Sequence, residues 1–125
     1  MLDKFPVTAT LTAVDIKRAR QFYTEKLGLK VEMEDPSPGI MFKAGKNTML
    51  YVYQRAGGTK ADNTAAAFRV DHIEKVMQEM KARGVAFEEY DMPGLKTEKG
   101  IATMGKVKSA WFKDTEGNIL GLTEM

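Results

Sequence analysis

The feature that most constrains the fold of this chain is an internal repeat with a spacing of 56 residues. Asp15 recurs as Asp71, and Gly28 recurs as Gly84 at the same spacing. Each aspartate follows a run that favours a strand and precedes apolar residues at helical spacing, and each glycine is placed to end that helix. A strand-like stretch follows both glycines. The sequence therefore predicts two copies of one β-α-β-β-β unit.

The predicted elements fill both copies. In the first copy, alternating apolar and hydroxyl residues over 7–14 predict a strand with one apolar and one polar face. This copy continues with a helix and three further strands, over residues 16–27, 29–33, 40–43 and 48–54. The second copy is predicted as a strand, a helix and three strands, over residues 65–70, 73–83, 85–90, 107–113 and 119–123. Asp15 and Asp71 are the candidate caps of the two helices.

Composition divides the chain into two modules of a single domain. Module one covers residues 1–56, a stretch of linker composition covers 57–63, and module two covers 64–125. The polar segment 91–106 is longer than an average connection and has two interpretations. It is either a lid with glycine hinges or an ordinary connection that contains a short strand at 101–104.

The composition excludes several classes of protein. The chain has 125 residues, no cysteine and one histidine, His72, which excludes a disulfide scaffold, a cysteine–zinc site and an intrachain two-histidine metal site. Basic and acidic residues are interspersed and the net charge is +2, which is only a weak signal for nucleic-acid binding. No apolar run approaches the ~20 residues of a membrane span, and the first residues lack the pattern of a signal peptide. We therefore expect a cytoplasmic protein with no nucleic-acid and no membrane partner.

Three segments resemble the vicinal oxygen chelate superfamily, which includes glyoxalase I, bleomycin-resistance proteins and extradiol dioxygenases. They are residues 13–29, with a Phe-Tyr and a Leu-Gly-Leu pattern, residues 68–74, and residues 111–120. The resemblance implies an α+β fold in which two tandem βαβββ modules form a curved mixed-sheet cup with the helices outside. It also implies a homodimer, as in most members, and it does not by itself identify the activity.

In this superfamily the metal ligands come from four strands, and they are usually histidine, glutamine or glutamate. The resemblance places these positions at Thr8, Tyr51, Ala65 and Gly121. A neutral hydroxyl and a phenol are poor ligands for zinc, nickel or iron, and alanine and glycine have no ligand atom in their side chains. A shift of the alignment by two residues brings in no histidine or carboxylate. We therefore predict no metal site and no cofactor.

The same alternation indicates what lines the cup in place of a metal. Hydroxyl, thioether, aromatic and cationic side chains share the cup face, and we predict that the following bind a ligand: Thr8, Thr10, Met49, Tyr51, Tyr53, Arg69 and Trp111. Each of these groups has an alternative interpretation. The strand preference of threonine and tyrosine alone explains Thr8, Thr10, Tyr51 and Tyr53 equally well. Arg69 is either an anion clamp or the partner of an acid such as Glu74 or Asp91. Trp111 either lines the cup or packs in the core.

The predicted function follows from these cup residues. Aromatic walls, hydroxyl groups and small residues favour a flat or amphipathic small molecule. We therefore predict a small-molecule binding protein of the glyoxalase/bleomycin-resistance type. The first alternative is a metal-dependent lyase or dioxygenase of the same superfamily, with metal ligands from the partner chain or from other positions of this chain than those aligned. The second alternative is a non-catalytic dimeric interaction module whose cup is filled by side chains.

Overall fold

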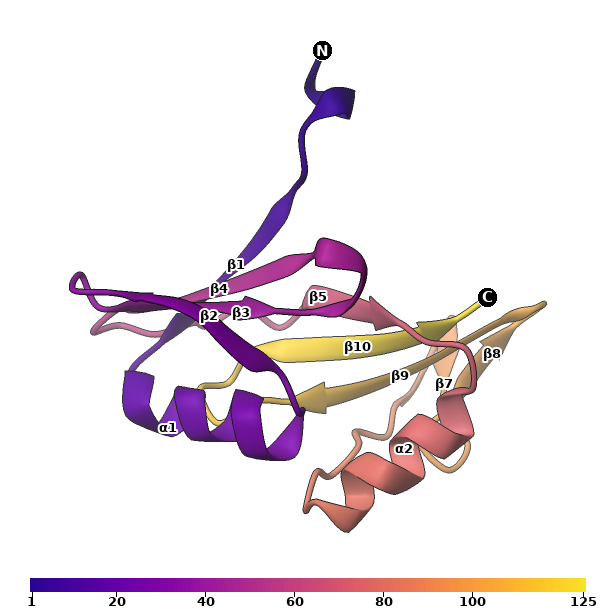
Figure 1. The fold of residues 1–125 in the computed structure, drawn as a ribbon. Coiled ribbons are helices and arrows are strands. Elements are labelled where there is room, and N and C mark those ends of the chain that lie inside the picture. The colour runs from indigo at the N-terminus through magenta and orange to yellow at the C-terminus, as the bar shows by residue number, and fades with distance from the viewer. The chain divides into compact units, whose positions relative to one another are not determined.

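The computed structural model describes residues 1–125 and confirms the α+β class. The chain divides into two compact units. Unit 1 comprises residues 1–60 and 115–117, and unit 2 comprises residues 61–114 and 118–125. Each unit contains one four-stranded mixed sheet and one α-helix (Figure 1).

The sheet of unit 1 has the strand order β1-β4-β3-β2. Its edge strand β1 runs parallel to β4, and the other neighbours are antiparallel. The elements are η1 (Leu2–Lys4), β1 (Thr8–Ala13), α1 (Ile16–Gln21), η2 (Phe22–Lys26), β2 (Lys30–Asp35), β3 (Gly39–Lys43), η3 (Gly45–Asn47) and β4 (Met49–Gln54). Their order along the chain is the predicted β-α-β-β-β.

The helix of unit 1 is capped as the sequence predicts, but its last turn is wider than an α-helix. Asp15 caps it by accepting a hydrogen bond from the backbone N–H of Arg18 at 3.1 Å. Gly28 ends the helical segment at a φ of 72°. The η2 turn is π-helical. In this turn the adjacent rings of Phe22 and Tyr23 are both buried, with their centroids 5.5 Å apart.

The predicted alternation separates a buried face from an open face of this sheet. The buried residues of β1, β3 and β4 form the core of unit 1 together with the helix: Leu11, Ala13, Ile40, Phe42, Leu50 and Val52. Tyr23 packs on Phe42 with the ring centroids 5.2 Å apart. The intervening threonines of β1 and tyrosines of β4 are not buried. The sheet therefore has one face that the core does not use.

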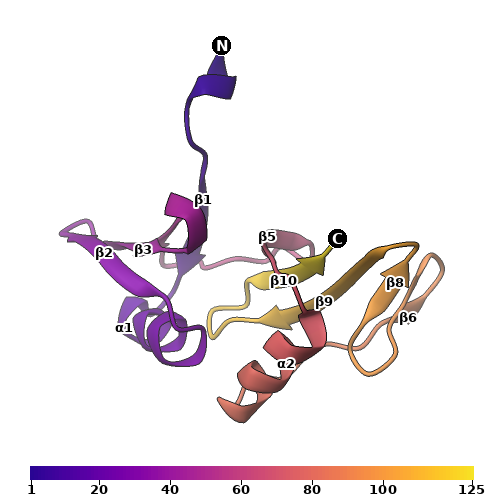
Figure 2. The same ribbon diagram turned by 45° about the vertical axis from the view of Figure 1, so that its right-hand side comes forward.

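The sheet of unit 2 has the strand order β5-β10-β9-β8, with β5 parallel to β10 and the other pairs antiparallel. The elements are β5 (Thr64–Arg69), α2 (Ile73–Ala82), β6 (Asp91–Met92), β7 (Leu95–Lys96), β8 (Ala102–Met104), β9 (Val107–Lys113) and β10 (Ile119–Glu124). Helix α2 packs against β9 and β10 (Figure 2). Of the apolar stripe that the sequence predicts on this helix, Ile73, Met77 and Met80 are buried and Val76 is partly buried. No helix in the structure has the length and apolar character needed to cross a membrane.

The strand predicted over residues 85–90 is absent. Phe87 forms an isolated bridge with Phe112, next to a backbone hydrogen bond from Glu88 to Trp111. The Glu89 carboxylate accepts hydrogen bonds from the hydroxyl of Thr97 at 2.6 Å and from the backbone N–H of Gly100 at 2.7 Å. These two hydrogen bonds tie residue 89 to the loop that follows instead of to a strand ladder.

The polar segment 91–106 contains the short strand that one of its two interpretations predicts. Strands β6 and β7 form a small hairpin, with Gly94 in its turn at a φ of 82°. Strand β8 then pairs with β9 and extends the sheet of unit 2.

The prediction that Asp71 caps α2 is wrong. The N-cap residue is His72, whose side chain makes no cap hydrogen bond. The backbone N–H of Ile73 instead donates to the Glu124 carboxylate at 2.9 Å. In unit 1 the side-chain oxygen of Gln54 accepts from the N–H of Ile16 at 3.3 Å. In each unit the last strand therefore supplies an acceptor for the first residue of the helix.

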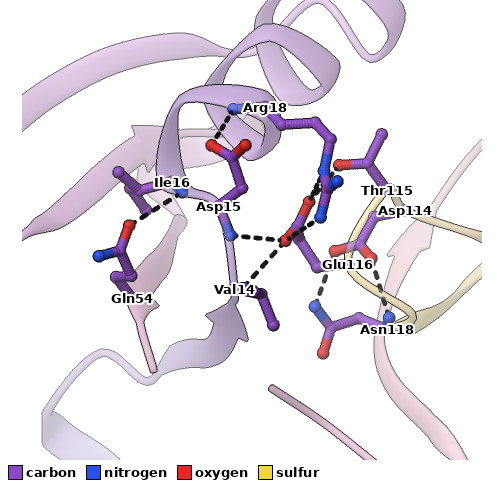
Figure 3. Close-up of polar contacts among 9 residues, drawn as sticks. All are labelled: Val14, Asp15, Ile16, Arg18, Gln54, Asp114, Thr115, Glu116 and Asn118. Atoms are coloured by element: carbon purple, nitrogen blue, oxygen red, sulfur yellow. Dashed lines mark hydrogen bonds and ion pairs between the residues drawn. The ribbon is translucent and has the colours of Figure 1, made fainter. Parts of the chain in front are cut away.

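Unit 1 contains a buried carboxylate. Glu116 lies in the turn between β9 and β10, and its side chain has no exposed surface. It accepts hydrogen bonds from the backbone N–H groups of Val14 and Asp15, both at 2.9 Å (Figure 3). The guanidinium of Arg18 donates at 2.7 and 3.1 Å, and the hydroxyl of Thr115 donates at 2.7 Å. Burial opposes ionisation, but these hydrogen bonds and the charge of Arg18 outweigh it and lower the pKa of Glu116 to about 2.

We expect Glu116 to make the stability of the fold pH-dependent in acid. Its pKa is about 2 in the folded chain and near 4.5 in the unfolded chain, so the unfolded state binds more protons between these values. Lowering the pH therefore favours unfolding. Roughly 3 kcal/mol of stability, fully present above about pH 5, should be lost as the pH falls through about 2. Urea unfolding over a series of acidic pH values measures this loss, and a constant free energy of unfolding would contradict it.

Candidate functional site

The open face of the unit 1 sheet carries five of the residues predicted to bind a ligand: Thr8, Thr10, Met49, Tyr51 and Tyr53. In the strand register Thr8 lies opposite Met49, and Thr10 lies opposite Tyr51. None of the five is buried. The face therefore has hydroxyl groups along its edge strand and thioether and aromatic groups beside them.

The two tyrosines of β4 form one aromatic surface. The rings of Tyr51 and Tyr53 are stacked, with centroids 6.1 Å apart and planes inclined by 19°. Tyr51 lies directly over Gly39 of β3. A Cβ atom built on that glycine would lie 2.1 Å from the Tyr51 hydroxyl oxygen and 2.6 Å from its Cζ. Only a residue without a side chain leaves room for the ring in this position.

Asp35, the last residue of β2, holds the hydroxyl end of this ring. The Tyr51 hydroxyl donates a hydrogen bond to Oδ2 of Asp35 at 2.7 Å. Oδ1 accepts hydrogen bonds from the backbone N–H of Ser37, at 3.0 Å, and from the Ser37 hydroxyl. The Ser37 hydroxyl, followed by the Tyr51 hydroxyl, lowers the pKa of Asp35. The hydrogen bond to Asp35 in turn raises the pKa of Tyr51.

These pKa directions favour recognition over acid–base chemistry. At neutral pH the Asp35 carboxylate stays charged and the Tyr51 phenol stays protonated, so neither group is poised to exchange a proton with a substrate. The single histidine, His72, stands at the start of α2, and no hydrogen bond of the structure joins it to a hydroxyl group.

Asp35 is not predicted from the sequence, because residues 34–39 have the composition of a turn. A bulge between Val31 and Met33 shifts the register of β2 by one residue. Met33 consequently lies opposite Met41, and Asp35 also belongs to the open face. Uninterrupted alternation from Val31 would have placed Asp35 on the buried face.

We expect Gly39→Ala to disturb this site more than the fold. The added methyl group would overlap the Tyr51 hydroxyl, so the ring must move and its hydrogen bond to Asp35 must break. Because the affected groups lie on the open face, the loss of stability should be about 1 kcal/mol. Urea unfolding and the tyrosine ring signals in NMR spectra measure the two effects. Gly45→Ala, where a methyl group meets nothing within 4 Å, is the control. Unchanged Tyr51 signals in Gly39→Ala would contradict the prediction.

Trp111 is partly buried on the sheet of unit 2, on the face opposite the core residues Ala110 and Phe112. Its indole N–H donates to the Thr64 hydroxyl at 3.0 Å, and its ring packs edge-on against Tyr90 with centroids 5.5 Å apart. In the strand register Trp111 lies opposite Gly121, which lies opposite Ala67. The two small residues form a flat floor beside the indole ring.

The same face carries two cations, Lys113, which pairs with Glu88 at 3.4 Å, and Arg69. Arg69 lies opposite Thr123, which lies opposite Ser109, so two hydroxyl groups share its row. Glu74, one of its predicted alternative partners, pairs instead with Lys108 at 3.0 Å. No ion pair of the structure involves Arg69. Its exposed guanidinium can therefore meet an anionic group.

The positions that the resemblance assigns to metal ligands do not supply a metal donor set. Thr8 and Tyr51 belong to unit 1, and Ala65 and Gly121 belong to unit 2. A bulge at the start of β10 brings Thr64, rather than Ala65, next to Gly121. No group of three or more histidine, cysteine, aspartate or glutamate side chains could hold a metal ion. The residues present therefore do not fit the divalent metal of the superfamily's enzymes.

The family comparison agrees with this architecture. The model of the Glyoxalase/Bleomycin resistance protein/Dioxygenase superfamily matches residues 6–122. The chain belongs to this superfamily. The resemblance seen in the sequence is thus confirmed.

Solved structures share the fold at low sequence identity. A putative glyoxalase family protein from Bacillus anthracis has a TM-score of 0.76 and 20% identity, over 96% of this chain and 93% of that chain. A superfamily member from Sphaerobacter thermophilus has a TM-score of 0.74 and 21% identity, over 97% of each chain. TnmS3, an antibiotic binding protein from a Streptomyces species, has a TM-score of 0.73 and 20% identity, over 96% of this chain and 94% of that chain. A comparison with curated proteins finds no match.

Proposed function

We propose that this protein binds a flat, amphipathic small molecule without using a metal ion. The observation that carries the proposal is the stacked pair of Tyr51 and Tyr53 on the open face of unit 1, with Tyr51 over Gly39. The rings form a partly exposed aromatic surface beside the threonine hydroxyls of β1. Apolar surface with a few polar groups at fixed positions is what a small-molecule site requires.

The open face of unit 2 supports the same function. Trp111 and Tyr90 offer aromatic surface beside the small residues Ala67 and Gly121, and Arg69 offers a charge for an anionic group of the ligand. One protein that shares the fold is an antibiotic binding protein. This likeness is in keeping with binding without chemistry.

The alternative functions are not favoured by an observation of this kind. A metal-dependent lyase or dioxygenase needs donor side chains that the four aligned positions lack. An interaction module with a filled cup needs both faces to be covered, whereas Tyr51, Tyr53 and Trp111 are partly exposed within their units. The homodimeric state and the cytoplasmic location expected from the sequence remain predictions.

Native mass spectrometry of the untagged protein, purified without chelator, tests the proposal. The protein is challenged with zinc, nickel, manganese and iron(II), and separately with a set of flat amphipathic compounds. We expect no stoichiometric metal and expect an organic molecule, either co-purified or added, to stay bound. One metal ion retained per chain or per dimer would overturn the metal-free hypothesis. The same spectra report the oligomeric state.

A further inference from the structure

Asp35 is a carboxylate without a cationic partner. It is partly buried next to the turn between β2 and β3, and none of the ion pairs in the structure involves it. Its neighbour Glu34 is paired with Arg20 at 2.8 Å. Asp35 is met only by the uncharged donors of Ser37 and Tyr51. Its negative charge is therefore left for a group from outside the chain.

The hydrogen bonds of Asp35 leave room for one more donor. A carboxylate can accept about four hydrogen bonds, two at each oxygen. Oδ1 accepts from the N–H and the hydroxyl of Ser37, whereas Oδ2 accepts from the Tyr51 hydroxyl alone. The remaining position is on Oδ2, beside the Tyr51 side chain.

The aromatic pair offers a second attraction for a positive charge. The face of a tyrosine ring attracts a cation within about 6 Å of the ring centroid. The centroids of Tyr51 and Tyr53 are 6.1 Å apart. A third ring between them would need a separation of about 7 Å, so a flat ligand must lie on the outside of the pair. A charged group at its end can then approach Asp35.

The two lysines on the same face are too far away to neutralise Asp35. Lys30 and Lys43 lie opposite each other at one end of β3, whereas Asp35 lies opposite Gly39 at the other end. Four residues of a strand span ~13 Å, which exceeds the ~8 Å Debye length at physiological ionic strength. The Asp35 end of the face is therefore locally negative.

We infer that Asp35 and the Tyr51–Tyr53 pair form a subsite for the positive charge of a flat cationic ligand, such as a quaternary or protonated amine on an aromatic ring. The inference rests on the proposed function and specifies its ligand class. The ring of the ligand stacks on a tyrosine, and its cationic group lies against Oδ2 of Asp35. A neutral analogue loses both charge interactions, and an anionic analogue is repelled.

Fluorescence titration with three tricyclic probes of similar size tests this subsite. The probes are N-methylacridinium, which is cationic, N-methylacridone, which is neutral, and acridine-9-carboxylate, which is anionic. We expect the cation to bind about tenfold more tightly than the neutral probe. Asp35→Asn should remove most of this preference and change the affinity for the neutral probe by no more than about twofold. Glu34→Gln removes the adjacent carboxylate, which is not on this face, and should keep the preference.

The outcomes separate this inference from the proposed function. Equal affinities for the cation and the neutral probe, or a preference that survives in Asp35→Asn, would overturn the inference and leave the proposed function standing. Failure of all three probes to bind the wild-type protein would overturn both. If Asp35→Asn does not fold, the salt dependence of the wild-type protein decides. The cation preference should shrink as salt is added, and a preference that does not respond to salt would count against Asp35.

Discussion

Glu116→Ala should lose about 3 kcal/mol of its free energy of unfolding. The Glu116 side chain is fully buried and accepts hydrogen bonds from Val14, Asp15 and Arg18. Removal of the carboxylate leaves the backbone N–H groups of Val14 and Asp15 without their acceptor. A buried donor that loses its acceptor destabilises the fold by more free energy than a typical hydrogen bond contributes.

A second arginine–glutamate pair of the same helix gives a matched control. Nε of Arg20 lies 2.8 Å from Oε1 of Glu34, nearly the 2.7 Å that separates Nε of Arg18 from Oε2 of Glu116. Both side chains of the control pair are about half exposed, at 51% and 53%. Glu34→Ala should therefore cost no more than ~1 kcal/mol. Urea unfolding measures both variants, and equal losses would show that burial does not set the contribution of Glu116.

Local sequence patterns predict most of the fold because they report which side of a strand or helix is buried. The alternation in β1 and β4 correctly separates the core from the open face that carries Tyr51 and Tyr53. The apolar stripe of α2 and the capping of α1 by Asp15 are local signals of the same kind. Each depends only on residues within a few positions of one another.

The features that were not predicted depend on contacts between residues distant in sequence or on a break in a regular pattern. Glu116 lies between the predicted strands 107–113 and 119–123 and has no predicted role, because its hydrogen-bond partners Val14 and Asp15 are about a hundred residues away. Asp35 reaches the open face because a bulge interrupts β2. Residues 85–90 have a strand-like sequence, but the carboxylate of Glu89 organises a loop. No local periodicity encodes these contacts.

Replacement of both Tyr51 and Tyr53 by leucine should weaken the binding of the neutral probe N-methylacridone about 100-fold. Stacking on a flat ring stabilises the complex in two ways, by burying apolar area and by the favourable geometry of an aromatic pair. Leucine buries only part of that area and forms no aromatic pair. The fold should tolerate the change, because both side chains lie on the open face while their neighbours Leu50 and Val52 keep the core packed. Fluorescence titration measures the affinity, and urea unfolding checks the fold.

The single variants Tyr51→Phe and Tyr53→Phe show which part of the pair acts on a neutral ligand. Each keeps its ring and removes only a hydroxyl, and Tyr51→Phe also releases Asp35 from its hydrogen bond. If stacking holds the ligand, both should bind N-methylacridone within about threefold of the wild type. A loss in Tyr51→Phe as large as in the double leucine variant would mean that the hydrogen bond from Tyr51 to Asp35, which fixes the ring over Gly39, matters more than the aromatic surface itself.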